Sequence, residues 1–135
     1  MTWRTYNPML EGVRYNAAKK TVIMLVTLQK SEKQYSPTTM YDDYVMSEEL
    51  VHWQTQARTT LESVVGQRYI NHEKEGIQML LFVRTSKEGG ATTSPYRFLG
   101  KVHYVSHEGS KPMSIVWKLE KKMPVSLFLE YTNVL

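Results

Sequence analysis

Apolar and polar residues alternate along much of the chain, and this period-two pattern predicts β-strands. It is clearest in residues 94–120, where apolar side chains stand at every second position on either side of a polar loop at residues 106–111. Two adjacent strands joined by that loop are therefore expected. Residues 21–28 and 77–85 are instead largely apolar throughout, which is typical of strands buried on both faces. Residues 12–16 add a short strand before them.

Residues 50–56 alternate as well, so they are expected to form a strand with two different faces. Trp53 lies on one face, while Gln54 and Gln56 lie together on the other. Aligned carboxamides both donate and accept hydrogen bonds. They can read a base edge or a phosphate, or they can form the solvated face of an edge strand, and the pattern leaves both interpretations open.

Two segments carry helical signals. Residues 66–74 favour a short helix that closes at Gly76, because glycine is the residue type that most often ends a helix. Within it, Arg68 and His72 are four residues apart, which on a helix puts both within reach of one anion. Pro124 stands where a first helical residue is typical, and the apolar residues after it follow helical spacing, so a terminal helix is favoured over a last strand.

These segments give five or six mostly antiparallel strands and two short helices, in an α+β domain that is mainly β. A sheet of this length with long crossing loops tends to close into a barrel or partial barrel. The 135 residues fit one domain, with residues 1–11 as a weakly ordered lead-in and residues 12–135 as the folded part. Residues 29–44 have no period, and they are expected to form a loop that is either functional or pinned to the surface by tyrosines such as Tyr41.

Charge and aromatic content point weakly toward a polyanion. Lys and Arg outnumber Asp and Glu by 17 to 13, a net charge of +4 that is also ordinary for a soluble surface. Nine tyrosines and three tryptophans offer flat faces for stacking on bases, although most aromatic residues serve packing. The lack of cysteine excludes disulfides, and no apolar run reaches the roughly 18 residues of a membrane span. A soluble, cytoplasmic protein is expected.

Motifs of common enzyme classes are absent: the sequence has no P-loop, no G-x-G-x-x-G, no G-x-S-x-G and no H-E-x-x-H. The strongest candidate for acid–base chemistry is His107 with Glu108, but neighbours on a strand face opposite ways and make a poor dyad. His103 and His107 have the spacing of a metal pair on a helix, whereas the pattern here predicts a strand. We therefore expect no catalytic residue, no metal and no cofactor.

Seven segments carry a resemblance to a known family, in the same order and spacing: VTLQKSEKQYSPTTMYDDY, ELVHWQTQ, GQRYINHEKE, LLFVR, PYRFLG, YVSHEGSKPMSIVWKLE and KMP. The chain resembles a domain of unknown function at the C-terminus of large bacterial proteins that carry a DEAD/DEAH-type helicase core and often a phospholipase-D-like nuclease. It departs from the family pattern at His52, where phenylalanine is usual, and at Thr55, where serine is usual.

Proteins with this layout resemble restriction or phage-defence systems, so the resemblance implies that the domain helps to choose the DNA. The aromatic-glycine strand at residues 96–100 and the closing strand at residues 115–119 are similar to PUA-like barrels, including the SRA and EVE readers of modified bases. By that analogy a base leaves the duplex and stacks on an aromatic side chain. The residues expected to bind it are Trp53 or Tyr41 as the stacking face, Gln54 and Gln56 as edge readers, and Arg68, His107 and Lys111 as phosphate or edge contacts.

Trp117 is assigned to the core, because it shares a strand face with Ile115 and Leu119. The leading expectation is thus a non-catalytic DNA-recognition module, a small PUA-like partial barrel whose partners are DNA and helicase or nuclease domains. Two alternatives remain. One is a protein-interaction module that docks on a helicase–nuclease assembly, and the other is a small nuclease or hydrolase that depends on His107.

Overall fold

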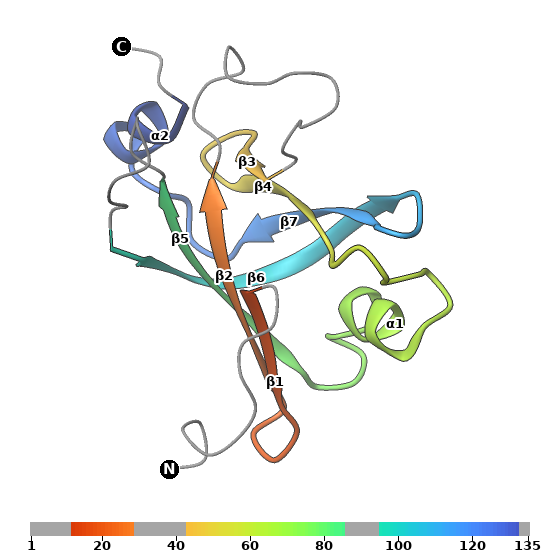
Figure 1. The fold of residues 1–135 in the computed structure, drawn as a ribbon. Helices are drawn as coiled ribbons and strands as arrows, with labels where there is room; N and C mark the ends of the chain where they lie inside the picture. The colour runs from red at the N-terminus through yellow and green to blue at the C-terminus, as the bar shows by residue number, and fades with distance from the viewer. Residues whose placement is uncertain (1–11, 29–42, 86–94, 133–135) are drawn as a thin grey trace.

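A computed structural model describes residues 12–28, 43–85 and 95–132 (Figure 1). Seven strands form one sheet in the order β1-β2-β5-β6-β7-β4-β3, and two helices flank it. The strands are β1 (Val13–Asn16), β2 (Thr21–Leu28), β3 (Tyr44–Val45), β4 (Leu50–Gln54), β5 (Gln78–Thr85), β6 (Arg97–Glu108) and β7 (Ser114–Leu119). The helices are α1 (Val64–Ile70) and α2 (Val125–Thr132).

The longest strand, β6, joins two halves of the sheet. Its first half pairs with β5 and its second half pairs with β7, both antiparallel. Two register shifts, one opposite Leu81 and Phe82 and one between Tyr104 and Ser106, interrupt these ladders. Such irregularities bend a strand and increase its twist. Figure 1 accordingly shows β1, β2 and β5 running together while β6 and β7 cross them.

Alternating side chains build the core between these halves. On β2 the inward residues Val22, Met24 and Val26 are buried, and on β5 Met79 and Leu81 are buried in the same way. Aligned pairing explains this, because Val22 stands opposite Met79 and Met24 opposite Leu81. Side chains that face the same side of a sheet in register bury their apolar area together.

Three aromatic rings fill the centre of the other half. Trp117 of β7 is fully buried, with Trp53 of β4 at 6.2 Å and Tyr69 of α1 at 6.4 Å between ring centroids. The assignment of Trp117 to the core is therefore confirmed. Its indole Nε1 is buried without a hydrogen-bond partner among the described residues.

Capping residues fix both helices. The Ser63 side chain accepts a hydrogen bond from the backbone N–H of Gly66, and so caps α1. The backbone N–H of Leu127 and that of Phe128 both donate to the carbonyl of Pro124, which opens α2 as proline does at a helix start. The predicted terminal helix is thus confirmed.

The expected α+β, mainly-β class with two short helices is confirmed, but three details differ. The sheet has seven strands because β3 is only two residues long, too short to show a period. The pairing of β2 with β5 is parallel. Among the described residues the sheet stays open, with β1 and β3 as its edge strands, so it does not close into a barrel. No described helix is long and apolar enough to cross a membrane.

Candidate functional site

Trp53, predicted to stack on a base, lies inside the protein. Its side chain is only 4% exposed, because β4 pairs it with Ile115 of β7 and turns it toward the core. The ring meets that of Tyr69 edge to face, with centroids 5.3 Å apart. The structure corrects this prediction: Trp53 has no open face for a nucleotide and serves packing.

The two glutamines do not line up as predicted, because β4 ends at Gln54 and Gln56 lies beyond the strand. The Gln56 side-chain carbonyl accepts hydrogen bonds from the Tyr69 hydroxyl at 3.1 Å and the Thr59 hydroxyl at 3.2 Å. The backbone N–H of Gln54 donates to Asp43 at 2.9 Å. Gln56 therefore holds α1 to the segment that precedes it.

Arg68 and His72 do not share an anion. The Arg68 guanidinium lies 4.0 Å above the Tyr15 ring, a cation–π contact that holds α1 against β1. His72 follows the end of α1 and is only 2% exposed. Its Nδ1 bonds to the carbonyl of Ile77 at 2.9 Å, and its Nε2 accepts from the N–H of Tyr104 at 3.2 Å. The prediction that both face one ligand is wrong, because His72 turns into the protein.

His107 and Lys111 lie near the β6–β7 turn. The predicted loop begins later than expected, because β6 continues to Glu108, which places His107 on the strand opposite Ile115. There its Nδ1 bonds to the Tyr104 hydroxyl at 2.7 Å. Lys111 is exposed, and its backbone N–H donates to the carbonyl of Thr59 at 2.9 Å.

The structure therefore brings two predicted residues together around Thr59, which contacts both Gln56 and Lys111. Tyr41 lies outside the described residues.

A second surface, which the sequence did not single out, lies on the outer face of β2, β5 and β6. Its centre is apolar and aromatic: Leu25 stands opposite Phe82, and Phe82 opposite Phe98. The two phenylalanine rings are 4.7 Å apart at 35°. Phe98 is 55% exposed, so one face of this pair is open. We call the outward residues of these strands the β5–β6 surface.

Basic side chains border the β5–β6 surface. Lys101 is exposed and stands opposite Leu80, and Arg14 stands opposite Ile23. Arg84 donates from Nε to the Thr27 hydroxyl at 3.0 Å, and its guanidinium lies 4.4 Å above the Tyr96 ring. Cations thus flank the exposed aromatic pair along the strand direction.

Three hollows follow β5 and β6. The central one, about 440 Å³, lies on the β5–β6 surface itself and is lined by Leu80, Phe98, Leu99, Gly100, Lys101, Glu120 and Lys121. Gly100 has φ +97°, and the space beside its Cα is open to at least 4 Å. A positive φ there suits glycine alone, and its missing side chain leaves the groove floor clear.

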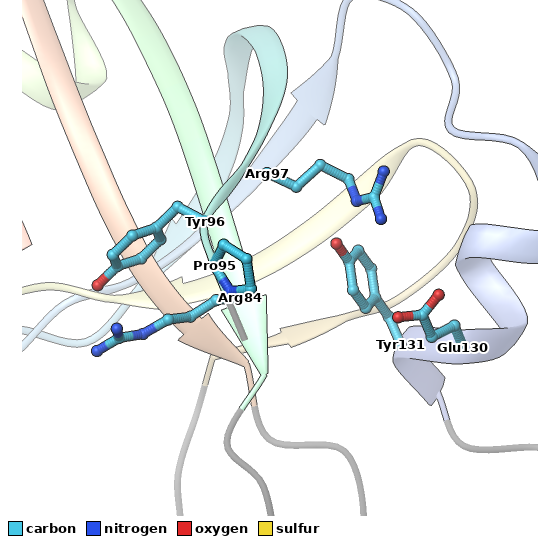
Figure 2. Close-up of a pocket in the computed structure, with 6 residues that line it drawn as sticks. All are labelled: Arg84, Pro95, Tyr96, Arg97, Glu130 and Tyr131. Carbon is cyan, nitrogen blue, oxygen red and sulfur yellow. The ribbon is translucent and has the colours of Figure 1, made fainter. Parts of the chain in front are cut away.

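The second hollow, about 210 Å³, lies at the Arg84 end of the surface (Figure 2). Pro95 separates two groups there: Tyr96 with Arg84 on one side, and Arg97 with Tyr131 of α2 on the other. Partial burial raises the pKa of Tyr131, while the hydrogen bond and positive charge of Arg97 oppose this shift. The tyrosine stays protonated at neutral pH and keeps its hydroxyl as a donor.

The third hollow, about 220 Å³, lies at the other end and contains His72, Glu73 and His103. Burial lowers the pKa of His72 from its ordinary value, although its bond to the Ile77 carbonyl opposes the shift. Partial burial also lowers the pKa of His103, but hydrogen bonds to Glu120 and Glu73 and the charges of both carboxylates outweigh it. The pKa of His103 therefore lies above its ordinary value.

One signal in the sequence points to the β5–β6 surface. Residues 21–28 and 77–85 carry apolar side chains at outward positions as well, at Ile23, Leu25, Leu80 and Phe82. This pattern predicts burial on both faces, yet in the folded chain Phe98 stays exposed beside Phe82. An apolar outward row in a sheet with few helices is also typical of a binding surface.

The family model described as a domain of unknown function (DUF3427) matches residues 1–131. No curated protein matches the chain.

Proposed function

The chain belongs to the DUF3427 family, whose function is unknown, and from its surface we propose that it is a non-catalytic DNA-recognition module. In this proposal the β5–β6 surface carries the contact with nucleic acid. The reading of a modified base, and the cooperation with helicase and nuclease domains in a restriction or defence system, come from the family resemblance and form part of the same proposal.

The observation that carries the proposal is the Phe82–Phe98 pair, with Phe98 exposed, between cations. Any of the bases can stack on an aromatic ring, so the contact does not depend on the nucleic-acid sequence, and each such contact contributes about 1–3 kcal/mol. Phe98, at 55% exposure, offers that face, and Lys101 stands three residues further along the same strand. Phosphates lie beside the bases, so a cation at the border of an aromatic surface suits a nucleic acid.

The size of the surface fits a short nucleic-acid segment. From Arg97 to His103, β6 rises roughly 20 Å at about 3.3 Å per residue. The three hollows follow this line in sequence order. OB folds, which bind single strands on a β-sheet surface, contact about 4–16 nucleotides each. The net charge of +4 favours association with a polyanion.

Base specificity is assigned to the polar residues near the β6–β7 turn. Gln54, His107 and Lys111 remain the candidate edge and phosphate contacts, in or beside the half of the sheet formed by β4, β6 and β7. The β5–β6 surface would then supply sequence-independent affinity, and the turn would supply the reading of the base.

The test is a fluorescence-polarisation titration with labelled single strands, unmodified duplexes and cytosine-methylated duplexes, at roughly 50 and 200 mM salt. We expect binding that weakens at the higher salt. Lys101→Glu should weaken it for every oligonucleotide and should lower the slope of log affinity against log salt by about 1 or more. Arg58→Glu makes the same charge change at an exposed position between β4 and α1, beside the proposed base-reading residues. Lys19→Glu, at an exposed position in the turn between β1 and β2, is the matched control and should leave binding unchanged.

Arg58→Glu also separates the two surfaces. If Arg58→Glu weakens binding and Lys101→Glu does not, the contact lies on the α1 side and the β5–β6 surface is excluded. If no oligonucleotide binds at the lower salt, the DNA proposal fails, and a docking surface for a protein partner becomes the better interpretation of the exposed Phe98.

A further inference from the structure

Two histidines and a glutamate line the third hollow, and a second glutamate, Glu120, contacts one of the histidines. His72 and Glu73 come from the turns after α1, His103 comes from β6, and Glu120 follows β7. The ligand atoms of His72, Glu73 and His103 all lie within 4.8 Å of one another. Two segments that are distant in sequence therefore place two imidazoles and a carboxylate around one point.

Both imidazoles are already oriented for coordination. The carbonyl of Ile77 can only accept, so His72 Nδ1, at 2.9 Å from it, carries the proton and Nε2 presents its lone pair. The Glu120 carboxylate likewise holds His103 Nε2 at 3.1 Å, and Nδ1 of His103 is the atom that contacts Glu73. Metal-bound histidines almost always have their other nitrogen fixed on an oxygen in this way.

The hollow leaves room for further ligands. The hollow, about 220 Å³ in volume, is lined by His72, Glu73 and His103 together with Lys101 and Gln78, among others. Zinc sites with two histidines and a carboxylate commonly have these three protein ligands and leave one position open to water. The cluster is thus reachable from solvent even though His72 itself is buried.

From this juxtaposition we propose that His72 Nε2, His103 Nδ1 and the Glu73 carboxylate form a binding site for a divalent transition metal such as Zn²⁺. The donor set decides the class of ion, because Ca²⁺ and Mg²⁺ prefer oxygen ligands alone whereas imidazole suits Zn²⁺ and its neighbours. The ion takes the place of the hydrogen bond from the Tyr104 N–H, which at 3.2 Å is a long one, and of the contact between His103 and Glu73.

A metal here would tie the turn after α1 to β6, across 30 residues of sequence between Glu73 and His103. It would also set a fixed positive charge beside Lys101, at one end of the β5–β6 surface. The site stands on its own contacts and does not depend on the DNA proposal.

The experiment is a calorimetric titration of the full chain with Zn²⁺ alone, supported by competition with a chromophoric chelator. We expect one Zn²⁺ per chain. His103→Gln should abolish this stoichiometric binding, and Glu120→Gln, which only loosens the His103 ring, should weaken it about 10–100-fold. His107→Gln and His52→Gln are the controls, because each removes an imidazole outside the cluster and should leave binding unchanged.

Thermal unfolding without metal shows whether each variant is folded. For a folded His103→Gln variant, Zn²⁺ binding equal to that of the wild type overturns the proposal. So does a wild-type chain that takes up no Zn²⁺, or one whose uptake is lost in His107→Gln instead. If His103→Gln does not fold, the Zn²⁺ affinity of Glu120→Gln is compared with that of the wild type, and an equal affinity overturns the proposal. Co²⁺ bound to the wild type should show the visible absorption of a tetrahedral site.

Discussion

Replacing Gly66 by alanine tests how tightly α1 is packed. Alanine is the better helix former by about 1 kcal/mol, so propensity alone predicts stabilisation. The structure predicts the opposite. A Cβ at Gly66 would lie well inside van der Waals contact of the Thr60 carbonyl oxygen, and 3.1 Å from the Met113 sulfur. Met113 is fully buried and cannot move freely.

The loss of stability in Gly66→Ala follows from the hydrogen bonds that the Thr60 carbonyl accepts. It accepts hydrogen bonds from the backbone N–H of Ser63 at 3.1 Å and from the Ser63 hydroxyl at 2.8 Å. Displacing it weakens both, at about 0.5–1.5 kcal/mol each, and overpacking adds about 1–3 kcal/mol. After the gain in propensity, Gly66→Ala should still destabilise the protein by roughly 1–5 kcal/mol.

Chemical denaturation with global fitting measures this difference directly. Val64→Ala is the matched control, because Val64 lies in the same helix at 75% exposure and its truncation should change the free energy of unfolding by less than about 0.5 kcal/mol. A Gly66→Ala variant as stable as the wild type, or more stable, would refute the packing of α1 on Thr60 and Met113.

Two further predictions concern the β5–β6 surface and the contact between the end of β4 and the start of β7. Phe98→Ala should raise the dissociation constant for a short single strand about 5–150-fold, from the loss of about 1–3 kcal/mol of stacking. Val105→Ala, at 47% exposure on the same strand, should change it little, and equal effects of the two would contradict the stacking role. Thr55→Val should lower the free energy of unfolding by about 1–3 kcal/mol, because it leaves the buried N–H of Met113 without its acceptor at 2.9 Å. An unchanged denaturation midpoint would exclude that contribution.

The fold class could be predicted from the sequence because alternation reports local burial. The face of β2 that meets the core is marked by its alternate apolar residues Val22, Met24 and Val26, and this can be seen without knowing which strand pairs with β2. The parallel partner of β2 could not be found in this way. Its partner β5 begins 57 residues further along the chain, at Gln78 opposite Thr21, and no local period carries that information.

The candidate site was harder to predict, since it depends on which face of each strand is covered. Trp53 was a reasonable stacking residue by type, but its pairing with Ile115 turns it inward. Phe98 had the same character and stays outside. The converging pair His72 and His103 lies in segments about 30 residues apart, so only the tertiary structure shows that their rings are 6.2 Å apart.

The most direct test of the DNA-recognition proposal is an NMR titration of ¹⁵N-labelled protein with a short single-stranded oligonucleotide. The proposal predicts that the largest amide shifts map to outward residues of β5 and β6, with Phe82, Phe98 and Lys101 among them. Shifts confined to α1 and the β6–β7 turn, or no shifts at a low salt concentration, would contradict it.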